Sequence, residues 1–145
     1  IPIDAFGDGA RSAFKLLTPL TALAAIASPD APGLVLWEEP ESYQNPQTLA
    51  RLLQEMSDLV RGKPIQVFMA THSLEVMAQV TAMLQTGQLG ADDALLFRLD
   101  LRDGELGSSW FDKDNLVAWL ESGLDPRTWQ EFVSPVQFRL RQEEA

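Results

Sequence analysis

Three carboxylates lie close together directly after an apolar segment of the chain. In "LVLWEEPE", residues 34–41, four apolar residues precede Glu38 and Glu39, and Glu41 follows one proline later. Successive side chains of a strand point to opposite faces, so two adjacent acids at a strand end can take different tasks. One can bind a divalent cation while the other orients a water molecule. Glu41 is either a third acid of such a site or a turn residue.

The only histidine of the chain follows a second apolar segment. "IQVFMA", residues 65–70, leads into "THS", which contains His72. The bulky, β-branched and aromatic residues of this segment and of "LVLW" predict two strands that are buried on both faces. A helical segment between them predicts a parallel pair, whose carboxyl ends meet at one edge of the sheet. We therefore expect Glu39 and His72 to face one ligand, although His72 can also be a hydrogen-bonding loop residue.

Two helices are predicted around the first strand. The apolar residues of 7–28 predict a buried helix that either kinks at Pro19 or restarts there. Loop residues then lead into the strand at 34–37. A second, amphipathic helix begins after the N-cap and first-turn pair Asn45-Pro46 and ends at Gly62.

The remaining elements complete a single α/β domain over residues 1–145. Ser73 can cap a third helix that runs to about Leu84. Asp103-Gly104 predicts the turn of a β-hairpin between "ALLFRLDL" and "ELGSSWF". Asp114 can cap a helix that stops at Gly123, and Asp125-Pro126 can open another. The predicted fold is a parallel sheet with flanking helices and a C-terminal hairpin.

Composition limits the classes of function. The 145 residues are 46% hydrophobic, enough for one core, and 11 Lys and Arg against 21 Asp and Glu give a net charge of −10. Such a chain repels nucleic-acid phosphates unless it has a local basic patch. It has no cysteine, and its longest apolar run, "LTALAAIA", is too short to cross a bilayer. We expect a cytoplasmic protein without membrane insertion. Because the chain begins with Ile1, we interpret it as part of a longer protein.

The order of the motifs resembles the C-terminal lobe of the ATPase head of ABC-type proteins, most closely the OLD-like and related RecF- or SMC-type members of the AAA-type ATPases. The resemblance identifies residues 34–41 as a Walker B motif, with Glu38 as the magnesium ligand and Glu39 as the catalytic glutamate. Most ABC-type proteins have Asp at the first of these positions, whereas the "EEPE" form is familiar among OLD-like members. Residues 43–46 fall at the D-loop, and His72 falls at the switch histidine.

The segment "FGDGAR", residues 6–11, resembles the signature motif of the OLD-like proteins. The resemblance assigns nucleotide contacts to Gly7, Gly9 and Arg11, and to Asn45 in the D-loop. Glycines let the backbone approach an anion, and a helix start offers free N–H groups. The glycines can also simply start a helix, and Arg11 can be a surface cation. In the family this segment meets a nucleotide bound by the opposite protomer, which implies a homodimer with ATP between the heads. Asp8 is expected to turn away from the phosphate.

The chain contains no GxxxxGK[ST] segment, and none of Lys15, Lys63 and Lys113 follows a glycine loop of that form. The resemblance places this Walker A motif in an N-terminal lobe, which we expect as a partner. The predicted function is one half of a P-loop NTPase-like ATPase that uses ATP and Mg²⁺. DNA is a candidate partner of the intact protein, but not through this acidic segment.

Two alternatives to the ATPase hypothesis are open. The first is a metal-dependent hydrolase whose ligands or acid/base groups are Glu38, Glu39, Glu41 and His72. The second is a non-catalytic assembly module of the same fold.

Overall fold

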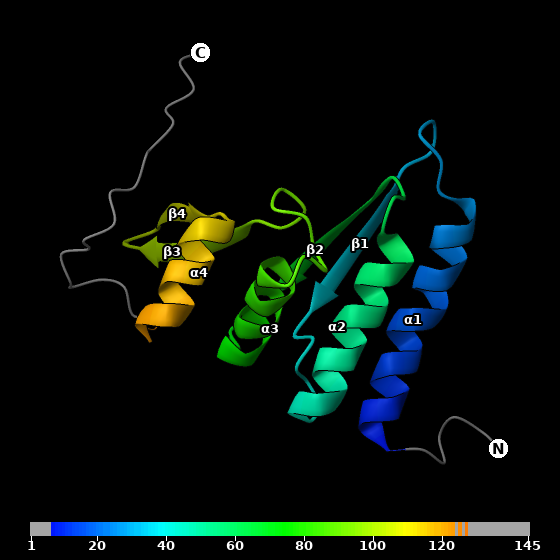
Figure 1. Ribbon diagram of the computed structural model, residues 1–145, viewed down its shortest axis with the longest axis horizontal. Helices are drawn as coiled ribbons and strands as arrows, with labels where there is room; N and C mark the ends of the chain where they lie inside the picture. The colour runs from blue at the N-terminus through cyan, green and yellow to red at the C-terminus, as the bar shows by residue number, and fades with distance from the viewer. Residues whose placement is uncertain (1–6, 124, 126, 128–145) are drawn as a thin grey trace.

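The structure, a computed structural model, describes residues 7–123, 125 and 127. Its elements in chain order are α1 (Asp8–Ile26), β1 (Gly33–Glu38), α2 (Pro46–Val60), β2 (Ile65–Ala70), α3 (Leu74–Gln85), β3 (Leu96–Arg102), β4 (Glu105–Phe111) and α4 (Lys113–Ser122) (Figure 1). Helices alternate with two parallel strands, and a hairpin follows. This order confirms the predicted α/β class with a C-terminal hairpin.

The strands β1 and β2 are parallel and hydrogen-bonded neighbours. Their register runs from Gly33 opposite Ile65 to Glu38 opposite Ala70, so both strands end at the same edge. The helix between them, α2, begins where the sequence predicts, because the Asn45 side chain accepts a hydrogen bond from the Thr48 N–H at 2.9 Å. The prediction that the two segments form a parallel pair with a shared carboxyl edge is confirmed.

Helices α1, α2 and α3 pack on one face of this sheet. Their buried side chains form one core cluster, and alternate strand residues pack against it. The helix residues of the cluster are Leu20, Leu49, Leu53, Met56, Val76 and Met83, and the strand residues are Val35, Trp37, Val67 and Met69. One face of the sheet is therefore covered by the three helices.

The opposite face of the sheet is open among the described residues. Leu34, Leu36 and Phe68 lie on it and are 58%, 75% and 52% exposed. The prediction that both strands are buried on both faces is therefore wrong for the described part of the chain. The strands are apolar on both faces, but the described helices of this chain cover only one of them.

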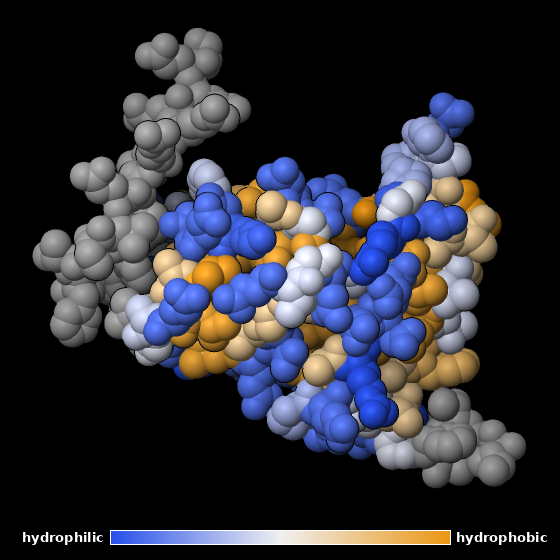
Figure 2. Space-filling model, viewed as in Figure 1, coloured by the Kyte–Doolittle hydropathy of each residue, from blue (hydrophilic) through white to orange (hydrophobic). Residues whose placement is uncertain are grey.

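Helix α1 is continuous from Asp8 to Ile26, with Pro19 inside it, so a restart at Pro19 is wrong. Only Leu20 and Ala24 of this helix are buried, and Phe14 is 53% exposed. All-round burial was expected from its composition, but α1 packs on α2 and β1 from one side only. Apolar (orange) surface is visible over α1 at the right of Figure 2.

The second half of the described chain forms its own core around α3, β4 and α4. Met77, Leu84, Phe111, Leu116 and Trp119 make this cluster. Met77 and Leu84 come from α3, and Val76 and Met83 of the same helix belong to the first core, so α3 connects the two.

The ends of the hairpin and of α4 follow from local chemistry. Asp103 and Gly104 have φ of 51° and 84°, which confirms the predicted two-residue turn. Asp112 caps α4 through the Asn115 N–H at 2.9 Å, so the predicted cap at Asp114 is wrong by two residues. Gly123, with φ of 65°, ends α4 as predicted. Of the helix predicted to open at Asp125-Pro126, the structure describes only Asp125 and Arg127, and the rest lies outside the described residues. In the described part of the chain, no helix is both long and apolar enough to cross a membrane.

Candidate functional site

The chain turns sharply where β1 ends. The Glu39 N–H donates a hydrogen bond to the Ala70 carbonyl oxygen at 2.8 Å, and Glu39 has a φ of 48°. This left-handed conformation is uncommon and costly for a residue other than glycine, and it often occurs at functional sites. The next side chain, Pro40, is fully buried, and the Ser42 N–H closes a turn on the Glu39 carbonyl oxygen at 2.9 Å. The turn is thus held by the hydrogen bond to β2, by the buried proline and by its own internal hydrogen bond.

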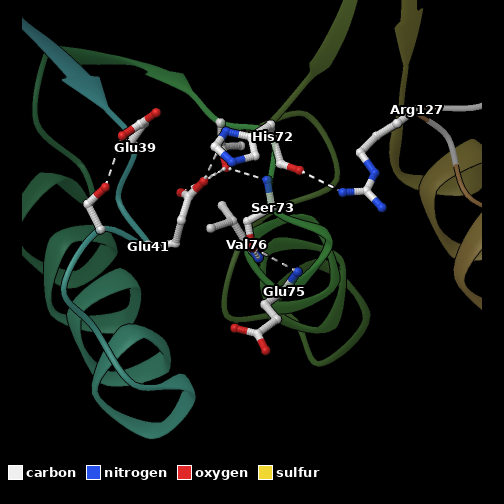
Figure 3. A network of polar contacts seen from close by, with 9 residues as sticks. Glu39, Glu41, His72, Ser73, Glu75, Val76 and Arg127 are labelled. Atoms are coloured by element: carbon white, nitrogen blue, oxygen red, sulfur yellow. Dashed lines mark hydrogen bonds and ion pairs between the residues drawn. The ribbon is translucent and has the colours of Figure 1, made fainter.

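The turn sends the three acids in three directions. Glu38 is exposed and shares the open face of the sheet with Leu36, because strand residues alternate. The Glu39 carboxylate accepts a hydrogen bond from the Ser42 hydroxyl at 3.0 Å. Glu41 points back toward the end of β2, where both of its carboxylate oxygens lie 2.9 Å from the Thr71 hydroxyl oxygen (Figure 3). The three carboxylates therefore have different surroundings.

His72 lies at the same edge, two residues beyond the end of β2. Its imidazole Nδ1 is 3.7 Å from Glu41 Oε1, and its side chain is 77% exposed. The Glu41 carboxylate points toward the His72 ring, whereas the Glu39 carboxylate does not (Figure 3). The structure thus brings together the two strand ends that the sequence predicts, and it gives Glu41 a place in the site beside its place in the turn.

Two residues that sequence reasoning did not single out complete this network. Thr71 accepts a hydrogen bond from the Ser73 N–H at 3.0 Å, in addition to its contact with Glu41. Because Thr71 belongs to the "THS" segment, the sequence could have pointed to it as a site residue. Arg127 donates from Nη1 to the His72 carbonyl oxygen at 3.1 Å. No sequence pattern could have shown this contact, because 55 residues separate the two positions.

The Arg127 guanidinium also binds Asp125. Its Nη2 lies 2.7 Å from Asp125 Oδ2, and its Nε lies 2.9 Å from Oδ1. These side-chain hydrogen bonds hold the pKa of Asp125 below its ordinary value and raise the pKa of Arg127. The arginine next to the His72 backbone is therefore a paired cation.

The predicted signature segment lies against the turn after β1. A Cβ added at Gly9 would come within 2.6 Å of the Tyr43 carbonyl oxygen, so only glycine fits there. The Gln44 side-chain amide donates to the Gly9 carbonyl oxygen at 2.9 Å. At Gly7, the N-cap of α1, an added Cβ would meet nothing within 4 Å. The structure thus gives Gly9 a packing reason that Gly7 lacks.

A surface hollow of about 250 Å³ lies beside this contact. Asp8, Arg11, Ser12, Lys15 and Tyr43 line it. Arg11 Nη1 lies 3.3 Å from Asp8 Oδ1, so the Asp8 charge is directed onto its own helix. The lining thus has two cations, two hydroxyls and one carboxylate, and the cations and hydroxyls are groups that can bind an anion.

Binding of a metal ion by protein side chains alone requires several ligand side chains that converge on one point. Among the residues described, no three His, Asp or Glu side chains converge on a point that could hold a metal ion. A metal-dependent hydrolase with an all-protein ligand set therefore finds no support there. Mg²⁺ that arrives with a nucleotide needs only one or two carboxylates, because phosphates and water supply the other ligands. The exposed Glu38 at the strand end fits that requirement.

The α/β layer, with two parallel strands that end in acids and a polar loop at one edge, is compatible with a P-loop NTPase-like fold. Residues 1–78 of the 145 match the family described as "AAA domain, putative AbiEii toxin, Type IV TA system". The match covers more than half of the chain and includes β1, β2 and His72, so the chain belongs to this AAA-domain family. No curated protein and no solved structure matches it.

Proposed function

We propose that this chain is the C-terminal lobe of an OLD-like, ABC-type ATPase and supplies Walker B, signature and switch-histidine elements to ATP hydrolysis at a dimer interface. The observation that carries the proposal is the parallel register of β1 and β2. It places the acids after Glu38 and the histidine after Ala70 at one edge of the sheet. Membership of an AAA-domain family supports an ATPase-like function in general.

Each residue at the edge has a role in this proposal. Glu38 binds the Mg²⁺ of Mg-ATP, which neutralises charge on the phosphates. Glu39 orients the attacking water, and it exchanges its present contact with Ser42 for that water when nucleotide is bound. His72 contacts the terminal phosphate with its exposed ring. Phosphoryl transfer depends mainly on such positioning and charge neutralisation.

The α1 segment serves the nucleotide of the other protomer in this proposal. Gly7 and Gly9 expose backbone N–H groups at the start of a 19-residue helix, and Arg11 adds a cation at the rim of the hollow. The side-chain oxygen of Asn45 accepts a hydrogen bond from the Thr48 N–H. Asn45 therefore contributes to the D-loop by holding that loop in place. The homodimer follows from this division of the site.

The open face of the sheet supports an N-terminal Walker A lobe as the partner. Leu34, Leu36 and Phe68 form an apolar surface of the kind that interacts with another element. Glu38 lies at the end of that same face, so an element covering it would also reach the proposed magnesium ligand. The chain supplies no Walker A lysine of its own.

Glu39→Gln in a protein that joins this segment to its Walker A half tests the proposal. The amide keeps the size of the side chain but loses the charge that orients water. We expect phosphate release to fall by about 100-fold or more, ATP binding to change little, and an ATP-bound dimer to accumulate in light scattering. Glu75→Gln, which removes an exposed carboxylate three residues after His72, is the matched control. Near wild-type hydrolysis by Glu39→Gln would remove Glu39 from the catalytic role.

A further inference from the structure

We infer that Glu41 is a positioning residue for the histidine: its carboxylate holds the Nδ1 side of the His72 ring and so presents Nε2 to the ligand. The inference rests on the proposed function only for the identity of that ligand, an anionic phosphate oxygen. The geometry at the two strand ends carries the rest.

The Glu41 carboxylate is held in place from below. Its side chain is only 18% exposed, although an unpaired carboxylate favours water. Both oxygens lie 2.9 Å from the Thr71 hydroxyl, which has a single proton to share between them. Each carboxylate oxygen can accept more than one hydrogen bond, so acceptor capacity is left for a second donor. The Nδ1 of His72 lies 3.7 Å from Oε1, just beyond hydrogen-bond distance, so a small rotation of the exposed ring would make it that donor.

The backbone on both sides of His72 is also fixed. Thr71 accepts from the Ser73 N–H, and the Ser73 hydroxyl caps α3 by accepting from the Glu75 and Val76 N–H groups at 3.2 and 3.4 Å. The Arg127 guanidinium holds the carbonyl group of His72 itself. The imidazole is therefore an exposed ring on a fixed backbone, and its remaining freedom is rotation of the side chain.

The other nearby acids are directed elsewhere. The Glu39 carboxylate faces Ser42, and the Glu75 carboxylate points away from the ring in Figure 3. Glu41 is thus the acid in a position to select the orientation and tautomer of His72. The hydrogen bond made by one imidazole nitrogen determines which nitrogen carries the proton.

The consequence for chemistry concerns the exposed nitrogen. With Nδ1–H on Glu41, the Nε2 of the neutral ring is an acceptor directed away from the carboxylate. When the ring is cationic, Nε2–H becomes a donor to an anionic oxygen, while Nδ1–H stays on Glu41. A ring flipped by rotation would place the donor on the wrong side. Glu41 therefore disfavours the flipped arrangement.

The single histidine makes the inference directly measurable. In the 145-residue chain labelled with ¹⁵N-histidine, the imidazole nitrogen shifts at a pH where the ring is neutral give the ratio of the two tautomers. We expect Nδ1–H to be the major form in the wild type, although a free neutral imidazole side chain favours Nε2–H. In Glu41→Ala the ratio of Nδ1–H to Nε2–H should fall by about threefold or more. Glu41→Gln, which keeps a weaker acceptor, should give an intermediate ratio, and Glu75→Gln should leave it unchanged.

Three results would overturn the inference. They are a wild type in which Nε2–H is the major form, a Glu41→Ala ratio equal to the wild-type ratio, or an equal change in Glu75→Gln. If Glu41→Ala does not fold, Glu41→Gln decides by the same criterion. No nucleotide is present in the measurement, so its outcome is independent of the ATPase proposal, and loss of that proposal would leave the tautomer result standing.

Discussion

The backbone N–H of Glu39 and the carbonyl oxygen of Ala70 are joined by a 2.8 Å hydrogen bond. This bond extends the parallel ladder one residue beyond the end of β1, to Glu39. Glu39 has a positive φ of 48°, so the chain leaves the extended conformation there. The second strand therefore fixes the position at which the first strand turns. The direction of every acid after Glu38 depends on this contact between segments that are 31 residues apart in the chain.

The 145-residue chain by itself should bind Mg-ATP with a dissociation constant of about 1 mM or weaker and should not hydrolyse it, because it has no Walker A lysine or glycine loop. Isothermal titration calorimetry measures the affinity, and a phosphate-release assay measures turnover. The control is the protein in which the chain is joined to its Walker A half. A dissociation constant of about 1 µM or tighter for the chain alone would contradict the proposed division into lobes.

Gly9→Ala should lower the free energy of unfolding by about 1–3 kcal/mol, because the new Cβ would lie 2.6 Å from the Tyr43 carbonyl oxygen. Alanine improves helix propensity, but by less than this backbone clash costs. Gly7→Ala is the matched control and should cost less than about 1 kcal/mol, since nothing lies within 4 Å of the added atom. Urea unfolding followed by circular dichroism compares the two. Equal stabilities of the two variants would show that the contact with Tyr43 is not tight.

Thr71→Val should lower the free energy of unfolding by about 1–2 kcal/mol, because it leaves the half-buried Glu41 carboxylate without its hydroxyl donor. Thr21→Val makes the same chemical change at an exposed helix position, where the hydroxyl donates to the Leu17 carbonyl oxygen. That control should change stability by less than about 0.5 kcal/mol. Urea denaturation of both variants measures the difference. A Thr71→Val variant as stable as Thr21→Val would mean that water replaces the hydroxyl.

Leu36→Ala should change the stability of the isolated chain by less than about 0.5 kcal/mol, since this side chain is 75% exposed. The same substitution at Leu53, which is 1% exposed, should cost about 2–5 kcal/mol by leaving a cavity. In the protein joined to its Walker A half, Leu36→Ala should lower the stability more, because we expect the Walker A lobe to bury the open face there. A negligible effect of Leu36→Ala in both proteins would argue that nothing covers this face.

Local chemistry in the sequence was enough for most element boundaries. Asn45-Pro46 starts α2, and Gly123 stops α4, because a cap and a left-handed glycine act over one helical turn. Asp103-Gly104 makes the hairpin turn for the same local reason, since both residues adopt positive φ. The cap of α4 was misplaced from Asp112 to Asp114, because both are aspartates and only the end of β4 at Phe111 decides between them.

The sequence by itself determined that acids and a histidine follow two strands of a parallel pair, because strand ends and their order can be predicted from residue patterns. Only the tertiary structure decided that Glu41, and not Glu39, lies beside His72, since this depends on the left-handed turn and the register with β2. The exposure of Leu36 was equally beyond prediction. An apolar strand residue shows that a face can be covered, whereas the packing of helices α1 to α3 shows which face this chain covers.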